Sequence, residues 1–246
     1  MHQLGLVSIS FRSLTPEQII AITLDAGLTC IEWGSDVHAP CHDIPNLETI
    51  ARLQKEAGIT CCSYGTYFKL GTDNLSQLPD YIAAAKILGT NILRLWCGDQ
   101  NYEKYAPEAW DQLVGQCKQA AAIAEAHGAE LCMECHNNTA TNCLAGALAL
   151  MNAVDSPAFR MYWQPNQYRT SDINKEYAAA AAPYIRHVHV FNWDGPAHYP
   201  LAEAVEIWRE YLNCLDGDRH LLLEFMPDND PNSLPAEAEA LRRIAL

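Results

Sequence analysis

The chain has 246 residues, of which 49% are hydrophobic, and it carries a formal net charge of −14 at pH 7. This apolar content can bury a large core, which excludes a disordered chain, and the negative charge disfavours binding to nucleic acids or anionic membranes. Because the first ten residues lack a signal-peptide pattern and no apolar run approaches about 18 residues, we expect a cytoplasmic protein with no membrane partner.

Short runs of β-branched and aromatic residues alternate with longer amphipathic patterns along the whole chain. The first helical pattern has Pro16 at its first position and stops at Gly27. The predicted strands are residues 4–11, 29–34, 60–68, 91–98, 129–136, 159–164, 185–193 and 219–226. The predicted helices are residues 15–27, 46–58, 75–89, 107–128, 142–154, 172–184, 201–217 and 233–246. No flexible linker or charge block divides these pairs, so we expect one domain over residues 1–246.

Eight strand and helix pairs in about 250 residues match the closed parallel (β/α)8 barrel, the TIM barrel, in number and length. A doubly wound open sheet is the alternative, but no glycine-rich GxGxxG turn follows any predicted strand. We therefore predict an α/β protein with a single-domain TIM barrel. In such a barrel the functional side chains lie at the C-terminal ends of the strands.

The ten cysteines are scattered through apolar runs, for example at Cys30, Cys61 and Cys132. They show none of the paired spacings that are typical of zinc sites. We expect them to be reduced core residues, as in a cytoplasmic protein.

Polar side chains occupy the ends of the last four predicted strands: Glu134, Gln164, His189 and Glu224. Burying a carboxylate inside an apolar strand is costly unless it is paired, hydrogen-bonded or bound to a metal. Two glutamate oxygens, one imidazole and one amide oxygen form a mixed ligand set that suits Mn²⁺, Mg²⁺ or Co²⁺. The sequence therefore predicts a divalent-metal site at this end of the barrel.

Each of these residues also has a structural interpretation. A lone glutamate at a strand end can cap a helix or pair with an arginine, and Arg94 and Arg186 are available for that. Two glutamates together with a His-x-His sequence on late strands make the metal interpretation the better one. Within that sequence His189 is the expected ligand, because it lies nearer the strand end, and His187 is either a hydrogen-bonding neighbour or a core histidine.

This arrangement resembles the xylose isomerase-like family of sugar phosphate isomerases and epimerases, within the superfamily of AP endonuclease family 2. The family also includes ketose 3-epimerases and inosose dehydratases, and the resemblance covers the whole chain. It implies four metal ligands at the ends of the fifth to eighth strands: a glutamate, an aspartate, a histidine and a glutamate. By position Glu134, His189 and Glu224 match three of them, and Gln164 stands in place of the aspartate.

Gln164 can offer a neutral carbonyl oxygen to a metal, so the site has two ligand carboxylates where the family has three. We expect the ion to be held more loosely, which lowers the reaction rate, and to polarise a carbonyl group more strongly, which raises it. These two effects oppose each other. The same substitution is also expected in a member of the family that has lost its activity.

The resemblance implies an acid–base mechanism in which Glu134 and Glu224 flank a hydroxy-carbonyl substrate. One carboxylate removes a proton from the carbon next to the carbonyl, the other returns it, and the metal stabilises the enediolate between the steps. Return to the opposite face epimerises a ketose, return to the neighbouring carbon interconverts aldose and ketose, and loss of a β-hydroxyl makes the enzyme a dehydratase.

The segment IEWGSDVHAP after the second predicted strand is also similar to members of this superfamily, which makes Glu32 and Asp36 candidates for the substrate side of the pocket. The other expected substrate-binding residues are His38, Arg94, His136, Gln167, His187 and Trp193. Arginine and histidine near a barrel mouth can equally be structural, and a tryptophan there can pack the rim.

The expected partner is a small sugar or sugar phosphate, with assembly as a homodimer or homotetramer left open. Two other classes remain as alternatives. A phosphodiester hydrolase of the AP endonuclease branch needs a multinuclear metal cluster, which the acidic charge and the few available histidines disfavour. A non-catalytic sugar-binding barrel is supported only by Gln164 and Gln167 at positions where the family has metal and substrate residues.

Overall fold

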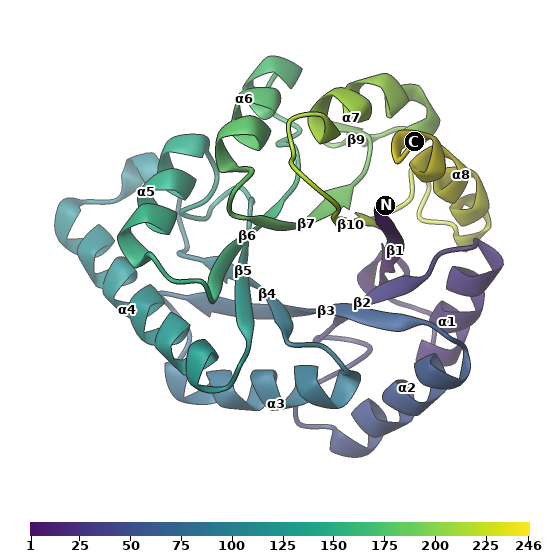
Figure 1. Cartoon of the computed structure of the whole chain (residues 1–246), viewed down its shortest axis with the longest axis horizontal. Helices are drawn as coiled ribbons and strands as arrows, with labels where there is room; N and C mark the ends of the chain where they lie inside the picture. The colour runs from purple at the N-terminus through teal and green to yellow at the C-terminus, as the bar shows by residue number, and fades with distance from the viewer.

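The computed structural model describes residues 1–246, and its eight long strands form a closed parallel barrel that the helices enclose as an outer ring (Figure 1). The barrel strands are β1 (Gln3–Val7), β2 (Cys30–Gly34), β3 (Thr60–Leu70), β4 (Ile92–Cys97), β5 (Glu130–Glu134), β6 (Phe159–Trp163), β7 (Ile185–Val190) and β10 (His220–Leu223). The helices are α1 (Pro16–Asp25), α2 (Ile44–Glu56), α3 (Leu78–Leu88), α4 (Pro107–Ala126), α5 (Leu144–Val154), α6 (Ser171–Ala181), α7 (Val205–Leu212) and α8 (Leu234–Ile244). The predicted single-domain TIM barrel is confirmed.

Local sequence signals set the limits of the first helix. The Thr15 side chain accepts a hydrogen bond from the Gln18 backbone, and the Gln18 side chain accepts one from the Thr15 backbone. This capping box satisfies two donors that the first turn would leave unpaired. Past the other end of α1, Gly27 adopts a φ of 68°, a left-handed conformation that glycine tolerates best.

The barrel closes where β1 pairs with both β10 and β2. At this seam a β-carbon added to Gly5 would lie 2.5 Å from the Cys30 carbonyl oxygen. Only glycine lets the two strands approach so closely, so Gly5 permits the contact at the point of closure.

Two segments differ from the sequence prediction. The predicted first strand ends at Val7, and Ser8–Phe11 forms a 3-10 helix (η1), in which Ser8 Oγ accepts a hydrogen bond from the Gly34 backbone and Ser10 Oγ one from the Phe225 backbone. Because these hydroxyls bind the backbone at the end of β2 and just after β10, the chain curls at the barrel mouth instead of staying extended. The predicted seventh strand ends at Val190, and a small hairpin of β8 (Trp193–Asp194) and β9 (Ala197–His198) follows it.

Most of the apolar core, a cluster of 65 buried residues, packs the helices onto the outer face of the barrel. All ten cysteines are free thiols, and eight of them are buried, in line with the expected reduced core. No helix is both long enough and apolar enough to cross a membrane.

The barrel interior has an apolar level with a polar level above it. Residues two apart on a strand point to the same side, so the polar residues Glu32, Arg94, Glu134 and Glu224 sit above the small apolar cluster that contains Cys30, Ile92, Cys132 and Leu222. The polar level therefore lies toward the C-terminal ends of the strands.

Candidate metal centre

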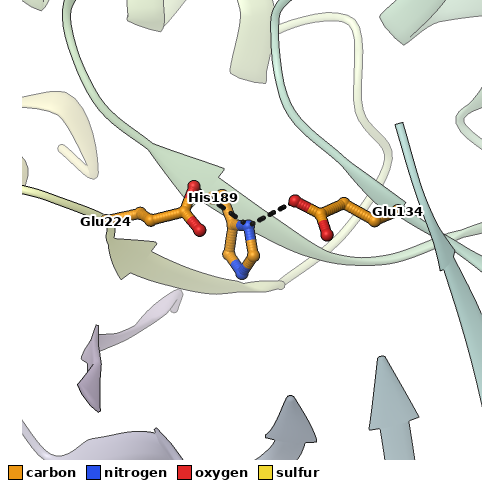
Figure 2. Close-up of side chains that lie close together, drawn as sticks. All are labelled: Glu134, His189 and Glu224. Carbon is orange, nitrogen blue, oxygen red and sulfur yellow. Dashed lines mark ion pairs between the residues drawn. The ribbon is translucent and has the colours of Figure 1, made fainter. Parts of the chain in front are cut away.

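Four of the predicted residues meet at the C-terminal end of the barrel. Glu134 ends β5, His189 lies in β7, and Gln164 and Glu224 directly follow β6 and β10. His189 Nδ1 is 3.0 Å from Gln164 Oε1, 3.4 Å from Glu224 Oε2 and 3.7 Å from Glu134 Oε1. Figure 2 shows the two glutamates approaching His189 from opposite sides. One ligand atom each from Glu134, His189 and Glu224 lies within 4.8 Å of the others, which is a spacing that can hold a metal ion.

Deep burial makes this arrangement costly without a counter-charge. His189 is fully buried and Glu134 and Glu224 are 3% and 5% exposed. Charges removed from water are destabilising unless they are paired or bind a cation. Glu134 and Glu224 therefore need positive partners within the barrel.

Arg94 supplies one positive partner from β4. Its Nε donates to Glu32 Oε1 at 2.8 Å, and its Nη1 donates to Glu134 Oε2 at 2.6 Å. Ser63 donates to the other oxygen of Glu32 at 2.7 Å. A β-carbon at Gly65 would lie 2.5 Å from Glu32 Oε1 and 2.9 Å from Arg94 Nη2, so glycine at this point of β3 leaves room for the ion pair.

The charges of this cluster shift the pKa values of its members. Burial opposes ionisation of Glu134, but Arg94 and His189 outweigh it and lower its pKa to about 2. Burial and the neighbouring Glu134 raise the pKa of Glu224. Burial disfavours the charged His189 ring, yet Glu224 and Glu32 raise its pKa to about 10. A proton and a metal ion therefore compete for His189 in this setting.

The donor set fits one divalent cation. Glu32, Glu134 and Glu224 contribute three negative charges and Arg94 one positive charge, which leaves two negative charges when His189 is neutral. A single Mn²⁺, Mg²⁺ or Co²⁺ would balance them, and Glu134, Gln164, His189 and Glu224 present the oxygen and imidazole donors that such ions accept. With an aspartate in place of Gln164 the balanced site would carry an excess negative charge.

Three of the predicted substrate-binding residues lie at the barrel mouth beside this cluster. His136, Gln167 and Trp193 line a cavity of about 270 Å³ together with Gln164. The His136 ring stacks on Trp96, with 5.1 Å between the ring centroids. Trp193 of β8 stacks on His198 of β9 on one side and on Phe191, which precedes the hairpin, on the other.

The other three predicted substrate-binding residues lie elsewhere. Arg94 is 2% exposed and is engaged by two glutamates, so it orders the carboxylates and does not reach into the mouth. His187 is fully buried in the apolar level, and its two ring nitrogens lie 2.8 Å from the Arg186 carbonyl and 3.2 Å from the Cys62 carbonyl. His187 therefore lies where the second of its two expected roles, that of a core histidine, places it.

His38 is also a core residue. It is 2% exposed, with Nδ1 3.0 Å from Ser8 Oγ and Nε2 3.1 Å from the Leu14 carbonyl. Of the neighbouring acidic candidates, Asp36 forms an ion pair with Arg12 at the rim, and Glu32 is fully buried below the cluster. Within this segment, Glu32 therefore holds Arg94 beneath the cluster, and Asp36 holds Arg12 at the rim of the barrel.

The buried His38 ring predicts an acid-sensitive contribution to stability. Burial lowers the pKa of His38 below the ordinary 6.5. Below about pH 6.5 the unfolded chain therefore binds a proton that the folded ring does not, and the free energy of unfolding decreases as the pH decreases. We expect the unfolding free energy to fall less steeply between pH 7 and pH 5 in His38→Gln, with a difference of at most about 1.4 kcal/mol per pH unit. Urea unfolding at a series of pH values measures this. The exposed His127 gives the control variant His127→Gln, and equal slopes in wild type and His38→Gln would contradict the prediction.

Two contributions to the site were not predicted from the sequence. Trp96 Nε1 donates to Glu134 Oε2 at 2.5 Å, and Ser63 Oγ, which holds Glu32, also lies 3.0 Å from the Tyr162 hydroxyl. A tryptophan at the end of β4 was expected to pack the rim or face a sugar. The two-residue spacing of Arg94 and Trp96 places both on the inner face of β4, which is a signal that could have indicated the hydrogen bond of Trp96 to Glu134.

Comparison with known proteins agrees with this architecture. The family model of the xylose isomerase-like TIM barrel matches residues 20–244, and the chain therefore belongs to that family. A comparison with curated protein sequences gives no match.

Solved structures with the same fold are distant in sequence. The probable 3-DHS dehydratase AsbF from Bacillus anthracis is 19% identical with a TM-score of 0.81, and the match covers 98% of this chain and 99% of that one. An L-ribulose 3-epimerase is 18% identical with a TM-score of 0.74 and coverages of 98% and 93%. A xylose isomerase-like TIM barrel protein from Mycobacterium smegmatis, in complex with magnesium, is 13% identical with a TM-score of 0.73 and coverages of 99% and 97%. These likenesses establish the shared fold.

Proposed function

We propose that the protein is a divalent-metal-dependent enzyme that moves a proton next to the carbonyl of a sugar or sugar phosphate, as an isomerase or epimerase does. The observation that carries this proposal is the pair of buried carboxylates, Glu134 and Glu224, on opposite sides of a cluster suited to a metal at the catalytic end of the barrel. A bound Mn²⁺, Mg²⁺ or Co²⁺ would polarise the carbonyl group and stabilise the negative charge that develops on its oxygen.

The protein's own residues would supply binding and proton transfer. The carboxylates are the acid and base candidates, because each reaches the cluster from its own strand end. The cavity beside them is lined by amides and aromatic rings, which suit the hydroxyl groups and the apolar faces of a sugar.

Inosose-type dehydration is the alternative within the same chemistry, because it begins with the same proton removal. A non-catalytic sugar-binding barrel would need no acid or base, and the buried glutamates give it no support. Only one cluster of three or more metal-binding side chains is present, whereas the phosphodiester hydrolases of the superfamily need several metal ions.

Deuterium exchange tests the proposal. Metal-free protein reloaded with Mn²⁺ is incubated in D2O with ketoses, their phosphates and inososes, and the substrates are followed by NMR. We expect deuterium to enter at a carbon next to the carbonyl in at least one of them, and only with metal present. No exchange in any substrate by protein shown to contain Mn²⁺ would contradict the proposed function.

Gln164 gives a prediction about the metal alone. Gln164→Asp adds a negatively charged oxygen donor to the cluster, and we expect the Kd for Mn²⁺ to fall by about tenfold because affinity rises with the number of charged ligands. Calorimetric titration measures both forms. Gln167→Asp adds the same charge at the cavity rim and is the control. Equal or weaker Mn²⁺ affinity in a folded Gln164→Asp variant, judged by circular dichroism, would show that residue 164 does not bind the metal.

A further inference from the structure

The two glutamates of the candidate centre differ in how their oxygens are held. Glu134 Oε2 accepts hydrogen bonds from Arg94 Nη1 at 2.6 Å and from Trp96 Nε1 at 2.5 Å. A carboxylate oxygen has two lone pairs, so both lone pairs of Oε2 are occupied. Oε1 is the oxygen that faces His189 Nδ1, at 3.7 Å. If Oε1 binds the metal, Glu134 has no oxygen that is free of both the metal and a hydrogen-bond donor.

Glu224 is held differently. The polar atom that faces its carboxylate is His189 Nδ1, 3.4 Å from Oε2, and no arginine or tryptophan donates to it. One of its oxygens can face the metal while the other stays free for a proton. The third buried glutamate of the barrel is occupied, because Glu32 accepts from Arg94 at one oxygen and from Ser63 at the other.

Epimerisation needs more than one free carboxylate. A proton must leave a carbon on one face and return to the same carbon on the other, so an acid and a base are needed on opposite sides of the substrate. Glu134 and Glu224 lie on opposite sides of His189 (Figure 2). When each gives one oxygen to the metal, only Glu224 keeps an oxygen that no donor occupies. We infer that the site transfers its proton with Glu224 alone, and that it isomerises or dehydrates its substrate and does not epimerise it. This inference rests on the proposed function.

Both reactions balance with one carboxylate. Glu224 takes the proton from the carbon next to the carbonyl, the C–H electron pair forms the C=C bond, and the carbonyl π pair moves onto oxygen to give an enediolate. In isomerisation Glu224 returns the proton to the former carbonyl carbon, while a hydroxyl proton passes from one oxygen to the other. In dehydration the carbanion electrons expel the β-hydroxyl, which leaves as water with the proton from Glu224. Neither reaction consumes another reagent.

The products of the exchange experiment test this inference. With Mn²⁺-loaded protein in D2O, D-fructose, L-ribulose and 3-DHS are followed for exchange, for aldose or dehydrated product, and for the 3-epimer. We expect the 3-epimer to form about a hundredfold more slowly than exchange, which is the lower end of what one positioned acid or base contributes. A deuterated 3-epimer formed at a rate within about tenfold of exchange would overturn the inference. Absence of any exchange would instead overturn the proposed function.

A second measurement reads the state of Glu134 without turnover. Trp96 is the indole whose N–H donates to a carboxylate, whereas Trp33 and Trp208 donate to an amide and to a carbonyl. We expect its ¹⁵N–¹H resonance to lie downfield of the other indoles, both in metal-free and in Mg²⁺-loaded protein. The resonance is assigned by its loss in Trp96→Phe and its persistence in the control Trp110→Phe. A Trp96 resonance that shifts upfield when Mg²⁺ binds would show that Oε2 is released, and would overturn the inference.

Discussion

Replacing Arg94 with methionine is expected to lower the free energy of unfolding of the metal-free protein by about 3 to 5 kcal/mol, the range measured when one partner of a buried ion pair is removed. Arg94 is 2% exposed, and the change leaves the buried carboxylates of Glu32 and Glu134 without their shared cation. Urea unfolding at pH 7 measures the loss.

Arg186 provides a matched control for this loss of stability. It pairs with Glu130 at 3.5 Å on the surface, where an ion pair contributes at most about 1 kcal/mol, so Arg186→Met should have a small effect. The double variant Glu32→Gln/Arg94→Met should recover part of the loss, because it also removes one of the unpaired charges. If Arg94→Met were within about 1 kcal/mol of the wild type, the buried network would not hold the site together.

Replacing Glu224 with glutamine is expected to reduce deuterium exchange about 10²- to 10⁴-fold at saturating Mn²⁺, because the amide keeps the side chain's shape but cannot accept the proton. The rate is measured by NMR on the substrate that the wild type exchanges best, with Mn²⁺ content checked in each sample.

Glu237 is the control for removing a buried glutamate. It is 6% exposed and lies on α8 in the outer ring of helices, where it accepts a hydrogen bond from the Leu201 backbone at 3.0 Å. Glu237→Gln should retain the wild-type exchange rate in its folded fraction. A Glu224→Gln variant that exchanged within tenfold of the wild type would exclude Glu224 as the base.

The fold follows from signals that act over short distances. The alternation of apolar strands with amphipathic helices, and caps such as Thr15 and Gly27, set the number and order of the elements. The 3-10 helix η1 was not predictable from local sequence because its cause is remote: Ser8 and Ser10 bind Gly34 and Phe225, which lie far away in the chain. The β8–β9 hairpin was missed because its two-residue strands are too short to show a period.

The candidate site was predictable to the extent that strand ends meet in a parallel barrel. That rule alone places Glu134, Gln164, His189 and Glu224 together. The partners of Arg94 could not be chosen from the sequence, because Glu32 and Glu134 come from different strands and meet only inside the barrel.

The depth of each histidine along the barrel axis was also only partly predictable from the sequence. Sequence position indicates that His187 and His189 share a face and that His189 lies nearer the strand end, but it does not decide whether His187 lies in the apolar level or beside the site. That difference depends on how the strands are tilted and staggered around the closed barrel.

The central claim is that the four strand-end side chains form one divalent-metal site. Anomalous diffraction from crystals soaked in Mn²⁺ tests it most directly, because it locates the ion independently of activity. We predict one strong peak per chain, at about 2.0 to 2.6 Å from Glu134 Oε1, Gln164 Oε1, His189 Nδ1 and a Glu224 carboxylate oxygen. A peak elsewhere on the protein, or no peak in the barrel at saturating Mn²⁺, would contradict the account.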